Sequence, residues 1–304
     1  MRGGYKIFDC DTHFHPSAET LVNYMTADLR ERQEEFERSE QQIGWAGEKM
    51  PTPYRHLYRF GGVGGWGANP PRHLGESGPR PNADRHFQRF MGATIPSLGG
   101  ADYAIEDRVL DMDREGQDIH LMVPSSPTGH PDVAVDMGMI QTVHRYLDDI
   151  CTTHGDRLCS LILTSARDIA SSVSEIQRYA SSKWAKGVMV NLPIDYPIDH
   201  PDLDPLWSAA NDAGHCIVHH SFAAGYPGYR DLWDNPFVGR TASHPWAAMR
   251  MVAAFLGAGL FDRFPDLRLS ILESGFGWLP FWMKRMEDQV LYMGYTADLK
   301  HTMT

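Results

Sequence analysis

Three side chains that can bind a metal ion stand at alternate positions near the N-terminus. Asp11, His13 and His15 lie in the run Ile7–Pro16, whose first residues are typical of a β-strand. Because successive strand side chains point to opposite faces, all three are expected on one side. Imidazole and carboxylate ligands together suit zinc and its first-row neighbours better than calcium or magnesium. The run predicts part of a metal site, although two solvated histidines at a strand end would give the same short pattern.

Composition narrows the class of partner. The 304 residues include 28 Lys and Arg against 39 Asp and Glu, for a net charge of -11. Nucleic acids and anionic membranes reward a basic surface, so neither is expected as the main partner. A small-molecule substrate is the better expectation.

The cysteines and the apolar runs indicate a compartment. Cys10, Cys151, Cys159 and Cys216 lie in or beside apolar runs without paired metal-type spacing, which is typical of reduced core cysteines. The N-terminus leads into the first strand without an apolar signal region, and no apolar run approaches the length of a membrane span. These features predict a cytoplasmic protein.

From residue 101 onward the sequence alternates amphipathic helices with short apolar strands. The predicted helices cover 105–115, 133–153, 169–182, 203–213, 245–256 and 281–291, and the predicted strands cover 119–123, 158–163, 187–191, 216–220 and 267–273. With the first strand, this gives six strands of a parallel sheet covered by helices. Polar residues follow the strands, among them Asn191, His220, Glu273 and Ser274, and no dinucleotide fingerprint follows the first strand. The pattern favours an α/β fold of the TIM-like (β/α) barrel type, with its site at the carboxyl ends of the strands.

A long insertion follows the first strand. We expect a single domain over residues 1–304, with residues 17–104 forming a lid over the barrel mouth. Its first part, Leu21–Gln42, is rich in Glu, Arg and Gln and predicts one or two exposed helices, and its remainder carries loop signals. A glycine-rich run at 61–67 lacks the strand and the Lys-Ser/Thr pair of a phosphate-binding loop.

Five stretches resemble successive motifs of the amidohydrolase-related family. They are Asp11–His15, Leu110–Gly116, Asp202–Trp207, Phe264–Arg268 and Leu272–Pro280, and they span nearly the whole chain in the expected order. That family includes aminocarboxymuconate-semialdehyde decarboxylase and metal-dependent decarboxylases of hydroxylated benzoic acids. The resemblance implies a distorted (β/α)₈ barrel with one divalent metal, for which we expect zinc, with manganese as the alternative.

The resemblance also implies a set of metal ligands. His13 and His15 match the first pair, and Asp11 stands where some members carry an acidic ligand instead. His220, six residues after Gly214, matches the third ligand. Strand parity does not decide between His220 and its neighbour His219, because both faces of a barrel strand are buried, but the motif register favours His220. His219 is then expected to pack or to support a ligand.

Two departures from the family pattern bear on the chemistry. Ser274 stands where the decarboxylases have a catalytic histidine, so Glu273 is the candidate for proton transfer, with bracing of a turn or of a ligand histidine as the alternative. No counterpart of the last two βα units, whose final strand ends in a metal-binding Asp, appears after Pro280. An open-edged sheet of this kind predicts a homodimer.

Several further residues are candidates for substrate contact. His244 is a second catalytic candidate beside Glu273, because it belongs to a loop that reaches the substrate in the family, although Ser243 and Pro245 around it also fit a helix start. Arg230 and Arg240 are candidates to receive a carboxylate, with a plain surface loop as the alternative. Asn191 and Ser274, at strand ends, complete the set.

The resulting expectation is a metal-dependent enzyme for a small, carboxylated, aromatic or cyclic substrate. Because the decarboxylase histidine is absent, hydrolysis through a metal-activated water is placed slightly ahead of non-oxidative decarboxylation. A catalytically incomplete barrel that serves binding or assembly is the alternative from another class.

Overall fold

The computed structural model describes residues 3–37, 40–42, 56–58, 105–124, 127–193, 196–220, 236–297 and 299. The chain divides into two compact units. The first holds residues 1–161 and 182–186, and the second holds residues 162–181 and 187–304. Each unit is described by itself.

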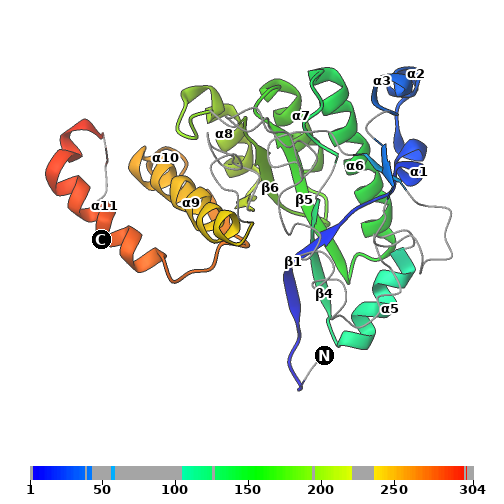
Figure 1. Cartoon of the computed structure of the whole chain (residues 1–304), viewed down its shortest axis with the longest axis horizontal. Helices are drawn as coiled ribbons and strands as arrows, with labels where there is room; N and C mark the ends of the chain where they lie inside the picture. Colours follow the sequence, from blue (N-terminus) through cyan, green and yellow to red (C-terminus); the bar gives the residue numbers. More distant parts are fainter. Residues whose placement is uncertain are drawn as a thin grey trace. The chain divides into compact units, whose positions relative to one another are not determined.

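Six strands form one sheet in the order β1-β4-β5-β6-β7-β8, of which Figure 1 labels β1, β4, β5 and β6. They are β1 (Phe8–Phe14), β4 (Ile119–Pro124), β5 (Leu158–Ser165), β6 (Ala185–Asn191), β7 (Cys216–His219) and β8 (Arg268–Ile271). The pairs β1–β4, β4–β5, β6–β7 and β7–β8 are all parallel. The predicted α/β class with six parallel strands is confirmed.

The first unit contains β1, β4 and the start of β5, with helices α5 (Ile105–Glu115) and α6 (Val133–Thr153). Helix α6 has the bounds that its apolar stripe predicts. Val135, Ile140 and Leu147 on that stripe are fully buried, since apolar residues at helical spacing gather on one face.

The segment after β1 also belongs to the first unit and differs from its prediction. It forms the short helices α1 (Ala18–Leu21), η1 (Val22–Tyr24), α2 (Ala27–Glu31) and α3 (Gln33–Phe36), followed by β2 (Glu40–Gln42), which pairs antiparallel with β3 (His56–Tyr58). Leu21, Leu29 and Phe36 are buried. The prediction of exposed helices was therefore wrong for one face, because apolar residues among the charged ones pack inward. The rest of the predicted lid lies outside the described residues.

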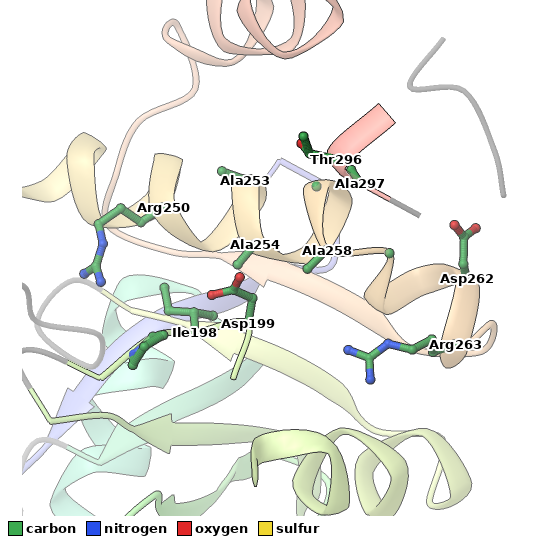
Figure 2. Close-up of a pocket in the computed structure, with 13 residues that line it drawn as sticks. Ile198, Asp199, Arg250, Ala253, Ala254, Ala258, Asp262, Arg263, Thr296 and Ala297 are labelled. Atoms are coloured by element: carbon green, nitrogen blue, oxygen red, sulfur yellow. The ribbon is translucent and has the colours of Figure 1, made fainter. Parts of the chain in front are cut away.

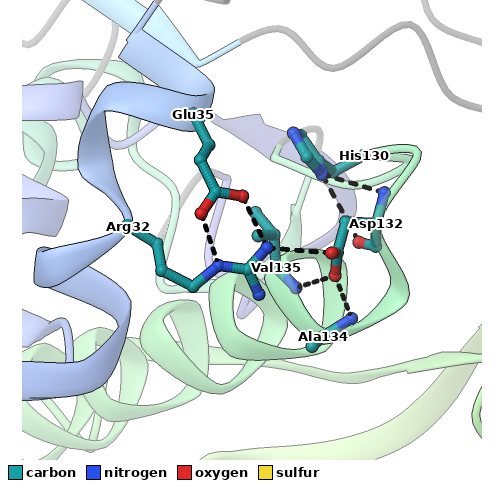
Figure 3. Close-up of polar contacts among 6 residues, drawn as sticks. All are labelled: Arg32, Glu35, His130, Asp132, Ala134 and Val135. Carbon is teal, nitrogen blue, oxygen red and sulfur yellow. Dashed lines mark hydrogen bonds and ion pairs between the residues drawn. The ribbon is translucent and has the colours of Figure 1, made fainter.

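A polar contact attaches α2 and α3 to the start of α6 (Figure 3). Oδ1 of Asp132 accepts hydrogen bonds from the backbone of Ala134 and Val135, which caps α6. Its Oδ2 accepts from Arg32 at 2.8 Å, and Arg32 also pairs with Glu35. These donors lower the pKa of Asp132 to about 2, so the cap stays ionised at neutral pH.

The second unit contains the end of β5, most of β6, and strands β7 and β8, together with the helices that the structure describes there. They are α7 (Ile169–Tyr179), η3 (Pro201–Leu203), α8 (Asp204–Asp212), α9 (Pro236–Gly257), α10 (Leu260–Arg263) and α11 (Leu279–Met293), with η4 (Gly294–Thr296) as a last turn. Trp207 of α8 and Phe255 of α9 are fully buried, and their ring centroids lie 5.2 Å apart in edge-to-face contact.

Helix α9 begins nine residues before the predicted start. Pro245 therefore lies in its interior, and Ser243 is not a helix cap. An interior proline costs about 3 kcal/mol because it lacks an N–H. Burial of Ala247, Ala248 and Phe255 on the same helix offsets this cost. A sequence prediction that treats Pro245 as a first-turn residue misses the preceding two turns.

The structure also bears on the predictions for the cysteines and for membrane-spanning segments. Cys151 and Cys159 are buried free thiols, and burial raises their pKa values to about 12 and 11, whereas Cys10 is exposed and not part of the core. In the described part of the chain, every helix is too short or too polar to cross a bilayer.

Candidate functional site

Strand β1 carries an irregularity just before its histidines. Asp9 pairs with His120 of β4, but the next pairing joins Thr12 to Met122. Two residues of β1 therefore stand opposite one residue of β4, which is a β-bulge. Asp11 lies in this bulge. Bulges re-aim side chains and are frequent beside active sites.

The three candidate ligands at the end of β1 lie close together. Oδ1 of Asp11 is 4.0 Å from Nε2 of His13. The rings of His13 and His15 are nearly parallel, with centroids 6.3 Å apart and an interplanar angle of 15°. This set of imidazole nitrogens and a carboxylate oxygen, partly open to solvent, matches the donors that zinc and manganese accept. The residues of the first unit fit a divalent metal.

In the second unit, Glu273 lies between two histidines. Its Oε2 is 3.5 Å from Nδ1 of His220, which follows β7, and 3.9 Å from Nδ1 of His244 in α9. The backbone oxygen of Glu273 also lies 3.0 Å from Nδ1 of His244. A carbonyl oxygen only accepts hydrogen bonds, so Nδ1 of His244 carries the proton of that contact.

Glu273 has a left-handed backbone, with φ of 55°. Among the described non-glycine residues, it alone has a positive φ. This conformation costs a residue with a Cβ about 1–2 kcal/mol, and such strain is concentrated at functional sites.

The turn that holds this strain is tied down by its neighbours. Oγ of Ser274 is 3.1 Å from the oxygen of Leu272 and 3.3 Å from that of His244. Nε1 of Trp278 donates to the oxygen of Ser274 at 2.9 Å. The hydroxyl of Ser274 therefore supports the turn, and its predicted contact with substrate stays a prediction.

His219 is fully enclosed. Its exposed fraction is 1%, and neither ring nitrogen has a hydrogen-bond partner in the described part of the chain. Burial, followed by the nearby charges of His220, Arg250 and His244, lowers its pKa to about 3. His219 is therefore neutral, in keeping with the predicted packing role.

The other candidates are placed only in part. Asn191 ends β6, and its Nδ2 donates to the oxygen of Thr164 at 3.2 Å. Arg230 lies outside the described residues. Arg240 lies in α9, but its side chain is outside the described part. The structure thus describes the surroundings of Asn191 alone among these three.

A cavity of about 890 Å³ in the second unit is separate from these candidates (Figure 2). Its walls include Asp199, Arg250, Ala254 and Arg263. None of the predicted metal ligands or proton-transfer residues lines it.

Two polar residues near β1 were not predicted to have a role. Nη2 of Arg108, in α5, donates to the backbone oxygen of His13 at 2.6 Å, and Nη1 contacts Nδ1 of His120 at 3.2 Å. The sequence signal was slight: a histidine on an otherwise apolar strand, with no spacing that links it to Arg108.

A family model matches nearly the whole of this chain. The family model described as amidohydrolase matches residues 9–299. A comparison with curated protein sequences gives no significant match.

Solved structures with this fold include several decarboxylases. The 5-carboxyvanillate decarboxylase of Sphingomonas paucimobilis has a TM-score of 0.61 at 18% identity, covering 98% of this chain and 77% of that one. The enzyme of the same name from Novosphingobium aromaticivorans, a mutant with bound manganese and 3-methoxy-4-hydroxy-5-nitrobenzoic acid, has a TM-score of 0.62 at 18% identity, covering 99% and 76%. The 2,6-dihydroxybenzoate decarboxylase of Rhizobium has a TM-score of 0.55 at 19% identity, covering 69% and 70%.

Proposed function

The chain belongs to the amidohydrolase family and is an enzyme of that superfamily, and from this premise we propose that it decarboxylates a small aromatic acid without an oxidant. The sequence placed hydrolysis slightly ahead. The similar solved structures are named for decarboxylation of 5-carboxyvanillate and 2,6-dihydroxybenzoate, which supports the alternative instead. The observation that carries the proposal is the carboxylate of Glu273 held between His220 and His244.

The proposed metal ligands are His13, His15, His220 and Asp11. His13, His15 and Asp11 provide nitrogen and oxygen donors at the end of β1, and His220 enters through the family motif. When bound, the metal supplies positive charge that orients an anionic substrate and stabilises developing negative charge. Manganese is favoured over zinc because a similar structure is named with bound manganese.

Glu273 is the proposed proton carrier. In decarboxylation the carboxylate carbon leaves as carbon dioxide, and its ring carbon takes a proton in exchange. His244 and His220 flank the Glu273 carboxylate, so these rings can share and position the proton that Glu273 delivers. Arg230, Arg240, Asn191 and Ser274 stay candidates for holding the substrate.

Hydrolysis is kept as a second candidate on one observation. Ser274 cannot replace an imidazole in acid–base chemistry, whereas a carboxylate such as Glu273 can accept a proton from a water beside a metal. In that case the same residue acts as a base rather than as an acid.

Product analysis separates the two. We would load the purified chain with manganese or zinc and supply 5-carboxyvanillate, 2,6-dihydroxybenzoate and related hydroxybenzoates in D₂O. Decarboxylation predicts carbon dioxide release and one deuterium at the vacated ring carbon. Cleavage of an ester, amide or lactone by the metal-loaded chain, without carbon dioxide from any hydroxybenzoate, would favour hydrolysis.

Metal stoichiometry tests the ligand set. We expect one manganese per chain, and weaker binding in the single variants His13→Ala and His220→Ala. If both histidines hold the same ion, the double variant loses little more than either single one. His154→Gln is the matched control, because His154 lies at the end of α6 outside both candidate groups. Unchanged binding in His220→Ala would remove that residue from the set.

The predicted homodimer is a separate proposal. Sedimentation equilibrium of the purified chain across a concentration series tests it. A monomer mass at every concentration would contradict it.

A further inference from the structure

A closed set of hydrogen bonds surrounds the bulge in β1. Arg108 reaches from α5 to three groups: its Nη1 is 3.1 Å from Oγ1 of Thr12 and 3.2 Å from Nδ1 of His120, and its Nη2 is 2.6 Å from the backbone oxygen of His13. On the far side of the ring, Nε2 of His120 is 2.5 Å from Oε1 of Gln117. One guanidinium therefore joins the histidine-bearing end of β1 to β4.

The same group of hydrogen bonds also reaches the part of β1 that precedes the bulge. Nε2 of Gln117 donates to Oδ2 of Asp9 at 3.2 Å, and Oδ1 of Asp9 accepts the backbone N–H of Asp11 at 3.0 Å. The bonds thus run from the amide of Asp11, through Asp9, Gln117, His120 and Arg108, to the carbonyl of His13. Both sides of the bulge are attached to β4 and α5 by side chains.

The donors and acceptors in this set have one consistent order. A guanidinium only donates, so Nδ1 of His120 accepts from Arg108 and the ring proton sits on Nε2. Nε2–H then donates to the carbonyl of the Gln117 side chain, whose amide nitrogen donates to Asp9. Burial, followed by the charge of Arg108, lowers the pKa of His120 to about 4, so the neutral ring that this order requires is the form present at neutral pH.

We propose that Arg108 and His120 are positioning residues that fix the bulge of β1 and thereby hold Asp11 and His13 ready for the metal. The inference rests on the proposed metal site. A bulged strand has lost ladder hydrogen bonds where the extra residue lies, so the backbone there depends on other contacts. Removing residues that orient metal ligands typically weakens metal binding by about 10–100-fold.

Arg108→Ala, Arg108→Lys and Arg114→Ala form the test series. Arg114 lies on the same helix, is exposed and pairs with Asp111 at 3.5 Å without contact to β1 in the described structure, so its variant controls for loss of charge on α5. Two quantities are measured: the manganese dissociation constant by titration calorimetry, and amide hydrogen exchange at Thr12, His13 and Phe14 in the metal-free chain.

We expect Arg108→Ala to weaken manganese binding about 10–100-fold and to speed exchange at these amides by at least tenfold. Arg108→Lys restores part of both, because an ammonium reaches one acceptor but cannot form the fork. Arg114→Ala changes neither. Exchange at residues 12–14 that is the same in Arg108→Ala and in the unmodified chain would overturn the proposal.

The metal-free measurement separates this proposal from the proposed function. If the unmodified chain binds no manganese or zinc, the metal site fails, whereas the exchange experiment still decides whether Arg108 holds the bulge. If the unmodified chain binds manganese and Arg108→Ala binds it equally well, the positioning role fails while the metal site stands.

Discussion

Oε2 of Glu273 lies 3.5 Å from Nδ1 of His220, at the only described non-glycine residue with a left-handed backbone. The left-handed backbone of Glu273 goes with a carboxylate position beside the ring of His220, which we propose as a metal ligand. Two roles fit this contact: Glu273 moves a proton, or it braces His220 as a ligand.

Glu273→Gln separates proton transfer from bracing. The amide keeps the size and hydrogen-bonding capacity of the side chain but cannot transfer a proton. We expect kcat to fall about 10²–10⁴-fold, with the manganese dissociation constant within about twofold of the unmodified chain. Glu287→Gln on α11, where Glu287 pairs with Lys284, is the matched control and should leave both unchanged. A large loss of metal affinity with kcat retained at saturating metal would instead assign the bracing role.

Glu273→Asn tests the strain itself. Asparagine tolerates a left-handed backbone better than glutamate does, because its short polar side chain bonds locally. We expect the free energy of unfolding of the metal-free chain to rise by about 1 kcal/mol while activity is lost. Chemical denaturation checks the first part. A variant less stable than the unmodified chain would show that the contacts of the Glu273 carboxylate outweigh its backbone strain.

His120 predicts a pH dependence of stability. Its pKa is about 4 in the folded chain against 6.5 as the ordinary value, so below pH 6.5 the unfolded state binds a proton that the folded state rejects. The free energy of unfolding should fall as the pH drops from 6.5 to 4, with this contribution levelling off below 4.

His120→Asn isolates that contribution, since Asn keeps an acceptor for Arg108 and does not titrate. Between pH 7 and pH 4, the unmodified chain should lose about 3 kcal/mol more stability than the variant in urea denaturation. Parallel curves for the two chains over this range would contradict the lowered pKa.

The structure could be predicted from the sequence where a single local pattern determined it. Helix α6 has its predicted bounds because an apolar stripe coincides with the cap at Asp132. The neighbourhood of His220 and Glu273 followed from the rule that parallel strands end at one edge, and these residues do lie together.

The structure could not be predicted from the sequence where two local patterns competed, or where two residues in contact are far apart along the chain. Pro245 fits a first helical turn, yet α9 continues through it because packing overrides the cost. The bulge at Asp11 is invisible to simple alternation, since an extra residue changes the pairing and not the residue types. Arg108 lies 95 residues from the His13 carbonyl that it binds, and no spacing rule links such positions.

Gly214 offers a last prediction, at the turn that leads from α8 into the strand carrying His219. Its φ is 68°, its N–H donates to the oxygen of Asn211, and no atom outside its immediate neighbours lies within 4 Å of a Cβ added there. Gly214→Ala should therefore cost about 1 kcal/mol through backbone strain alone, and Gly214→Asn less. Gly257 is the matched control: it also has open space around an added Cβ but no positive φ, so Gly257→Ala should be neutral or slightly stabilising. Because the strain is local, specific activity per folded Gly214→Ala chain should match that of the unmodified chain, and equal stability of the two alanine variants in urea denaturation would contradict the left-handed conformation.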